Sequence, residues 1–114
     1  MKCYTRRMDI EISVAELKTR MDSGTPPLLI DVREPWENER CSIPGAKLIP
    51  MRQVPEELES LKAETREIVV HCHHGGRSMR VVSWLRSQGV ASARNLSGGI
   101  DSWAAEIDPS VARY

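Results

Sequence analysis

The residue types most able to do chemistry stand in one short run, Cys72-His73-His74-Gly75-Gly76-Arg77-Ser78. The cysteine ends an apolar stretch, and the two glycines let the backbone curl tightly before a helix begins. Such a loop can turn successive N–H groups inward and form a nest for an anion, reinforced by the helix dipole. A thiol at its centre has a lowered pKa, and Arg77 adds a cation, so the run predicts Cys72 as a nucleophilic thiolate. The same nest would hold the terminal sulfur of a persulfide, which is also anionic.

The chain has three cysteines, and the ordinary interpretation of each is a small buried hydrophobe in a reducing compartment. An odd number with no spacing framework argues against a disulfide scaffold. For Cys72, packing alone would not require the glycines, the arginine and the helix start that follow it. A functional role is therefore favoured for this cysteine.

Two short runs rich in β-branched residues, 28–32 and 68–72, predict strands buried on both faces of a parallel sheet. Strands that alternate with helices predict an α/β fold with right-handed crossovers. The helix signals are a capping box at Ser13, a start at Pro55, an apolar spacing from Ser78 to Arg86 closed by Gly89, and a last helix after strand 93–96 and Gly98-Gly99.

In such a sheet, functional residues gather beyond the carboxyl ends of the strands. Cys72 ends a strand at this edge. Cys41 follows the helix that returns from the first apolar run, so it is expected at the opposite edge, and Cys3 precedes the first strand and is expected away from the site. Four segments leave strands and therefore share the functional edge: 33–36, 50–53, 73–78 and 97–99.

Composition limits the class of protein. The 114 residues fit one domain, 1–114, with a tail at 107–114 laid over it. Sixteen basic and sixteen acidic residues give a net charge of zero, without the basic stripe that a nucleic-acid surface needs. No apolar stretch has the length of a membrane span or a signal peptide, so a cytoplasmic protein is expected.

The loop at 72–78 resembles the active loop of rhodanese domains, Cys-x-x-Gly-x-Arg. One departure from the family is Cys41-Ser42, where many members carry Gly-His. The likeness covers three further motifs between residues 28 and 103, in the family's order: Leu29-Ile30-Asp31-Val32-Arg33-Glu34, Ile43-Pro44-Gly45-Ala46-x-x-Ile49-Pro50 and Leu96-Ser97-Gly98-Gly99-Ile100-x-x-Trp103.

This resemblance implies the rhodanese-like fold, a five-stranded parallel sheet flanked by helices on both faces. It implies a sulfurtransferase that moves sulfane sulfur from thiosulfate or a persulfide donor to a thiophilic acceptor through a Cys72 persulfide, with thiosulfate:cyanide activity and without cofactor or metal. Residues 106–114 resemble the end of rhodanese domains fused to adenylyltransferases for ubiquitin-like proteins, which points to a sulfur-carrier or other acceptor protein as partner. The catalytic residue is then Cys72, and the substrate-binding loop consists of His73, His74, Gly75, Gly76, Arg77 and Ser78.

Other chemistries fit parts of the same run. Loops of related folds that bind phosphate or arsenate have five residues between Cys and Arg, whereas four separate Cys72 from Arg77. The run His71-Cys72-His73-His74 offers zinc ligands, but four consecutive residues cannot all converge on one tetrahedral ion. His73 and His74 are expected either to line the loop mouth or to be solvated. A non-catalytic interaction module would be expected to lack the cysteine.

Several lesser residues have two interpretations. Asp31 and Arg33 stand at a strand end, where they either bond the loop or a donor anion or form an internal ion pair. Arg52 follows the third strand, and a solvated surface arginine is favoured over a contact to the donor. The three tryptophans are expected to pack in the core or at its rim: Trp36, Trp84 and Trp103.

Overall fold

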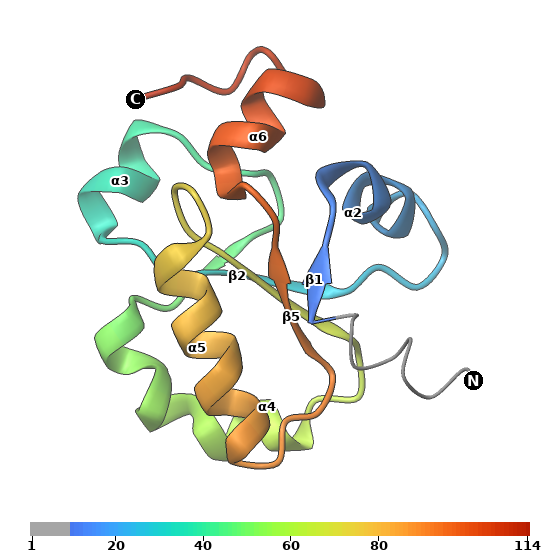
Figure 1. Cartoon of the computed structure of the whole chain (residues 1–114), viewed down its shortest axis with the longest axis vertical. Helices are drawn as coiled ribbons and strands as arrows, with labels where there is room; N and C mark the ends of the chain where they lie inside the picture. Colours follow the sequence, from blue (N-terminus) through green and yellow to red (C-terminus); the bar gives the residue numbers. More distant parts are fainter. Residues whose placement is uncertain (1–9) are drawn as a thin grey trace.

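The computed structural model describes residues 10–114, so Cys3 lies outside the described residues. Within this range the strands form one parallel five-stranded sheet in the order β1-β5-β4-β2-β3 (Figure 1). The two apolar runs of the sequence are its central neighbours, with Leu29 opposite Val69 and Ile30 opposite Val70. The strands are β1 Glu11–Ile12, β2 Leu28–Asp31, β3 Lys47–Leu48, β4 Ile68–His71 and β5 Ala93–Leu96.

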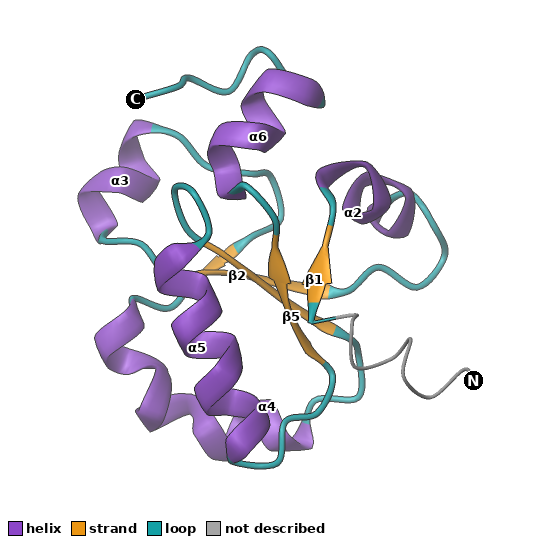
Figure 2. Ribbon diagram, viewed as in Figure 1, coloured by secondary structure: helices purple, strands orange, loops and turns teal. Residues whose placement is uncertain are grey.

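Helices pack on both faces of the sheet (Figure 2). One core cluster lies under α4 and α5 and contains Val70 and Cys72; the other lies under α2 and α6 and contains Val69 and Trp103. The α/β fold with helices on both faces is therefore confirmed. The helices are α2 Val14–Met21, α3 Pro35–Arg40, the 3-10 helix η1 Met51–Glu57, α4 Leu58–Ala63, α5 Gly76–Ser87 and α6 Gly99–Glu106. No helix among the described residues is long and apolar enough to cross a membrane.

The helix starts follow the local signals, with one exception. Ser13 caps α2 by accepting a hydrogen bond from the Glu16 amide at 3.0 Å. The start predicted at Pro55 is wrong, because the chain turns into η1 at Met51 and Pro55 lies inside that element. A proline lacks the N–H that a helix interior uses, but a short 3-10 segment leaves many such groups unpaired anyway.

The prediction for Cys41 is also wrong. Arg33, directly beyond β2, donates from Nη2 to the Cys41 carbonyl oxygen at 2.7 Å, which holds Cys41 at the carboxyl edge. The physical reason is the length of α3: its six residues rise about 9 Å, and they do not carry the chain back across the sheet. In Figure 1, α3 lies at the same end as the loop between β4 and α5.

The side chain of His71 is fully buried within the sheet. His71 ends β4 opposite Asp31 of β2, and its Nε2 has no hydrogen-bond partner among the described residues. Burial lowers the pKa of His71 to about 4; Asp31 opposes this effect and the Arg33 charge adds to it. The imidazole is therefore neutral in the folded protein, and it lies on the face opposite Cys72.

We expect the free energy of unfolding to fall when the pH is lowered from about 7 to about 5.5. The pKa of His71 is near 6.5 in the unfolded chain and about 4 in the folded protein, so the unfolded state binds the proton first. The stabilisation is complete above pH ~6.5 and is lost progressively towards pH ~4, with a loss of about 1 kcal/mol over the stated interval. Urea titrations across this range measure it.

The control is His71→Asn, which cannot take up a proton and should flatten the pH dependence of the unfolding free energy. A smaller slope should remain from half-buried His73, whose pKa is also lowered by burial. If the variant kept the full wild-type slope, the assignment to His71 would be wrong.

Candidate active site

Cys72 follows the last residue of β4 and is almost fully enclosed, with 1% of its surface exposed. Its Sγ accepts hydrogen bonds from the Gly75 amide at 3.1 Å and the Ser78 amide at 3.4 Å. The Ser78 hydroxyl lies 3.3 Å from the same sulfur. Burial raises the pKa of the Cys72 thiol, but the Ser78 hydroxyl and the amides of Ser78, Gly75 and Arg77 outweigh it and leave the pKa lowered. The predicted nest is present, and Cys72 lies at its centre.

The curl of the loop depends on Gly75. Its φ of 115° is in the region that favours glycine, and a Cβ there would lie 3.6 Å from Asn95 Nδ2 and from the Gly98 amide nitrogen. Gly76, in contrast, has no positive φ and is the first residue of α5. One glycine, not two, therefore makes the turn.

The loop is held from behind by α6. The Ile100 amide donates to the Cys72 carbonyl oxygen at 3.0 Å, and the Asp101 amide donates to that of His73 at 3.1 Å. This approach leaves no space at Gly99, where a Cβ would lie 2.5 Å from the Cys72 carbonyl oxygen. The N-terminal amides of α6 thus take the loop carbonyls as partners.

A buried asparagine on the neighbouring strand contacts the loop at Gly75 and at Ser78. Asn95 of β5 donates from Nδ2 to the Gly75 carbonyl oxygen at 3.3 Å, and its Oδ1 lies within hydrogen-bond distance of the Ser78 hydroxyl, whose single proton serves either this oxygen or Cys72 Sγ. Sequence reasoning missed Asn95. The available signal was a polar residue within a short strand that leads to the functional edge.

Arg77 does not lie free beside the sulfur. Its guanidinium donates to both carboxylate oxygens of Glu37, at 2.8 and 3.0 Å. This bidentate pair is the main reason that the pKa of Glu37 falls to about 2, and the Glu34 amide and the Tyr114 hydroxyl support it against the cost of burial. The Arg77 side chain keeps 37% exposure, and its pKa is raised by Glu37 and, to a smaller degree, by Cys72. Sequence reasoning missed Glu37, which lies on a short helix in which half of the residues are charged.

Asp31 and Arg33 form the internal ion pair rather than a contact to the loop or to a donor. Arg33 Nη2 lies 2.8 Å from Asp31 Oδ2, and both side chains are fully buried. Burial lowers the pKa of Arg33, but the bonds to Asp31 and Tyr114 raise it overall. Burial raises the pKa of Asp31, yet its bonds to Arg33 lower it overall, so both groups stay charged.

The remaining residues lie around the mouth or away from it. His73 is half-buried and His74 is exposed, with their rings stacked at 4.0 Å. Arg52 is exposed and pairs with Glu34 at 2.7 Å, which fits the solvated interpretation. Trp103 packs in the core as expected, but Trp36 is 60% exposed and does not.

One group of possible metal ligands falls at the mouth. Ligand atoms of His73, His74 and Asp101 lie within 4.8 Å of one another. The nearly parallel rings, 19° apart, aim their nitrogen lone pairs along neighbouring planes rather than at one point. Asp101 is also occupied by Arg113, whose Nε donates to it at 3.0 Å. The prediction that no metal is required stays a prediction, and this geometry fits it.

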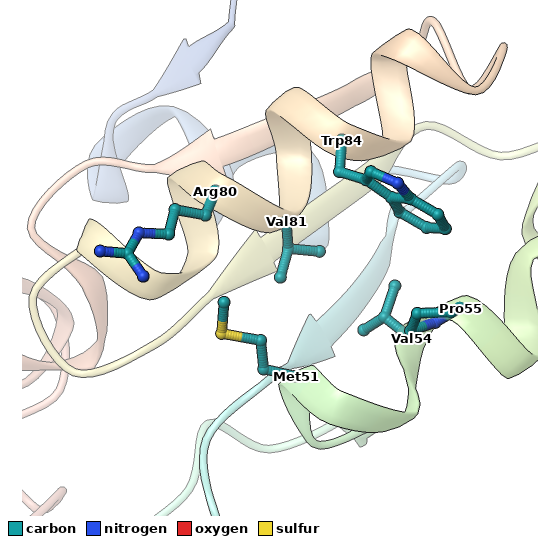
Figure 3. Close-up of a pocket in the computed structure, with 6 residues that line it drawn as sticks. All are labelled: Met51, Val54, Pro55, Arg80, Val81 and Trp84. Atoms are coloured by element: carbon teal, nitrogen blue, oxygen red, sulfur yellow. The ribbon is translucent and has the colours of Figure 1, made fainter.

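A groove of about 180 Å³ runs between η1 and α5 (Figure 3). Arg80 lies at one end of α5's wall and Trp84 at the other, with Val81 between them. The facing wall consists of Met51, Val54 and Pro55. The groove contains no nucleophile, so the chemistry of the molecule stays with the loop at Cys72.

Comparison with known proteins agrees with this geometry. A family model described as rhodanese-like domain matches residues 13–106. The chain is 34% identical over 102 residues to a sulfurtransferase of Allochromatium vinosum, covering 90% of this chain and 94% of that protein. It is 41% identical over 111 residues to a chloroplastic rhodanese-like/PpiC domain-containing protein of Arabidopsis thaliana. The aligned region covers 91% of this chain but only 37% of that protein.

A crystal structure of a rhodanese-like domain protein from Staphylococcus aureus superposes with a TM-score of 0.77 at 33% identity, covering 91% of this chain and 97% of that one. The chain belongs to the rhodanese-like sulfurtransferase family. The family resemblance seen in the sequence is confirmed, and the class of reaction it supports is sulfur transfer.

We expect the Cys72 thiol to titrate below the free-cysteine value of about 8.5, because the Ser78 hydroxyl and three amides stabilise the thiolate. The rate of iodoacetamide alkylation at Cys72, followed against pH by peptide mass spectrometry, measures the midpoint. Ser78→Ala removes the hydroxyl and keeps the amides, so its midpoint should lie between those of the wild type and a free thiol. A wild-type midpoint at or above 8.5 would contradict the activation of this sulfur.

Proposed function

We propose that this protein is a sulfurtransferase that carries sulfur as a Cys72 persulfide, with thiosulfate or a small persulfide as donor. The observation that supports it best is the set of donors around Sγ, from Gly75 at 3.1 Å to Ser78 at 3.4 Å. These groups stabilise the thiolate before transfer and a second sulfur anion after it. A helix start behind them favours negative charge further.

The reaction is a double displacement. The Cys72 thiolate attacks the outer sulfur of thiosulfate, the S–S bond of thiosulfate breaks, and sulfite leaves with the bonding electron pair. An acceptor such as cyanide or a thiolate then attacks the outer sulfur of the Cys72 persulfide. The persulfide bond breaks, thiocyanate or a new persulfide leaves, and the Cys72 thiolate is restored. No electrons are gained or lost overall, so no cofactor is needed.

Phosphate or arsenate chemistry is the second candidate, and loop size disfavours it. Four residues lie between Cys72 and Arg77, and the amide N–H groups of the loop donate to the sulfur itself. A tetrahedral oxyanion needs a wider ring of donors. Cys72-dependent turnover of p-nitrophenyl phosphate, without sulfur transfer, would favour the second candidate.

A protein acceptor extends the proposal. The tail at 107–114, which resembles the end of rhodanese domains fused to adenylyltransferases, favours a sulfur-carrier protein as the partner that takes sulfur from Cys72. Its exposed outer groups, such as Ser110 and Arg113, remain accessible to solvent.

Incubation with thiosulfate should add one sulfur atom to the intact protein, and cyanide should remove it. Cys72→Ser should abolish both the added mass and thiocyanate formation, because it removes the attacking sulfur. Cys41→Ser is the matched control: its thiol lies 3.9 Å from Arg33 Nη1 and makes no contact with Cys72 Sγ among the described residues, so activity should stay near that of the wild type. Sulfur uptake by the Cys72→Ser protein would overturn the proposal.

Replacing Arg77 by Ala should reduce kcat/KM for thiosulfate on the order of ten- to a hundred-fold, because a charge-assisted contact contributes about 1.5–3 kcal/mol. The guanidinium keeps outward N–H groups for an anionic donor while Glu37 holds its other side. Arg80→Ala, one turn further along α5 and also exposed, is the control for general charge loss. Equal losses in the two variants would assign the effect to net charge and not to Arg77.

A further inference from the structure

The side chain of Tyr114 lies outside the family match at 13–106, yet it reaches the site. Its ring stacks on His73 with centroids 4.0 Å apart and planes only 5° apart. Its hydroxyl lies 2.8 Å from Arg33 Nη1 and 2.8 Å from Glu37 Oε1. Trp36 meets the same ring edge-on at 6.2 Å. One residue of the tail therefore contacts groups from the ends of two strands and from α3.

The direction of the two hydroxyl bonds is fixed by Arg33. A guanidinium has only donors, so the Tyr114 oxygen accepts from Arg33 and its own proton is free for Glu37. Arg33 is in turn locked by Asp31, with which it shares a fully buried ion pair. The hydroxyl thus links a rigid buried cation to the Glu37 carboxylate.

The Glu37 carboxylate depends on this link for its full set of donors. Oε2 accepts from Arg77 at 2.8 Å and from the Glu34 amide at 2.9 Å. Oε1 accepts from Arg77 at 3.0 Å and from Tyr114 at 2.8 Å. Without the hydroxyl, Oε1 keeps only Arg77, so the carboxylate loses one of the four hydrogen bonds that fix its orientation, and the bound guanidinium can shift with it.

We propose that Tyr114 is a positioning residue for sulfur transfer, acting through Glu37 to set where Arg77 presents its charge beside the Cys72 loop. The role in transfer rests on the proposed function, whereas the positioning of charge can be measured without it. The ring of Tyr114, stacked on His73, seats the hydroxyl in place.

The test compares two alkylating reagents of nearly the same size, anionic iodoacetate and neutral iodoacetamide. Both transfer a carbon to the Cys72 thiolate with release of iodide, so the ratio of their rates reports the local positive charge. Peptide mass spectrometry assigns each rate to Cys72. Tyr114→Phe keeps the stacked ring and removes the hydroxyl; it should lower the iodoacetate-to-iodoacetamide ratio about three- to ten-fold and leave the iodoacetamide rate within two-fold.

Arg77→Ala supplies the background that separates positioning from a general structural effect. If Tyr114 acts through Arg77, Tyr114→Phe should change the ratio by less than about two-fold in that background. Ser110→Ala removes a hydroxyl from the same segment, where Ser110 bonds Asp108, and serves as the matched control with an unchanged ratio. A ratio unaffected by Tyr114→Phe, or an effect that persists without Arg77, would overturn the inference.

Sulfur transfer is then measured on the same variants. Tyr114→Phe should raise KM for thiosulfate about three- to ten-fold and change kcat by less than two-fold. If the wild type alkylates as expected but takes up no sulfur, the proposed function fails while the positioning role of Tyr114 stands. If the wild type transfers sulfur and Tyr114→Phe matches it in both ratio and KM, the positioning role fails while the function stands.

Discussion

A sulfur anion that is removed from water needs hydrogen-bond donors from the protein. The rest of the structure depends on supplying these donors to Cys72 Sγ. Burial alone would raise the thiol pKa, and only hydrogen bonds from the loop reverse that effect. Those bonds require the left-handed turn at Gly75 and the helix start at Gly76. The buried strands supply the rigidity: β4 delivers the cysteine to the edge of the sheet, and its neighbours on both sides fix where that edge lies.

The two sides of the loop have opposite hydrogen-bonding needs. Its N–H groups face inward to the sulfur, so several of its carbonyl oxygens face outward and need partners of their own. The N-terminal amides of α6 donate to the carbonyl oxygens of Cys72 and His73, and the side-chain amide of Asn95 donates to that of Gly75. Because an anion nest and its outer carbonyls form together, the last helix is as much a part of the site as the loop. Because these amides must approach the loop carbonyls closely, no side chain fits at Gly99.

Local patterns predicted the parts of the structure that short-range physics decides. The central strands, the Ser13 cap and the position of Cys72 follow from apolar runs, capping and sheet topology. The misses involve distant partners: Glu37 meets Arg77 across 40 residues and Tyr114 meets Arg33 across 81. No spacing rule links such positions. Cys41 was misplaced because the length of α3, rather than its existence, decides at which end of the sheet the chain emerges.

The bidentate contact between Glu37 and Arg77 has a consequence for selectivity among solutes. Of the five N–H groups of the guanidinium, two donate to the protein's own carboxylate, and the other three have no hydrogen-bond partner among residues 10–114. An internal carboxylate is present at every moment and cannot diffuse away, so it acts as a permanent competitor against any anion in solution. Abundant ions with one weakly held charge, such as chloride, gain little from a cation already half neutralised. The residue that holds the arginine in place thereby also weakens the attraction of its charge for small anions in solution.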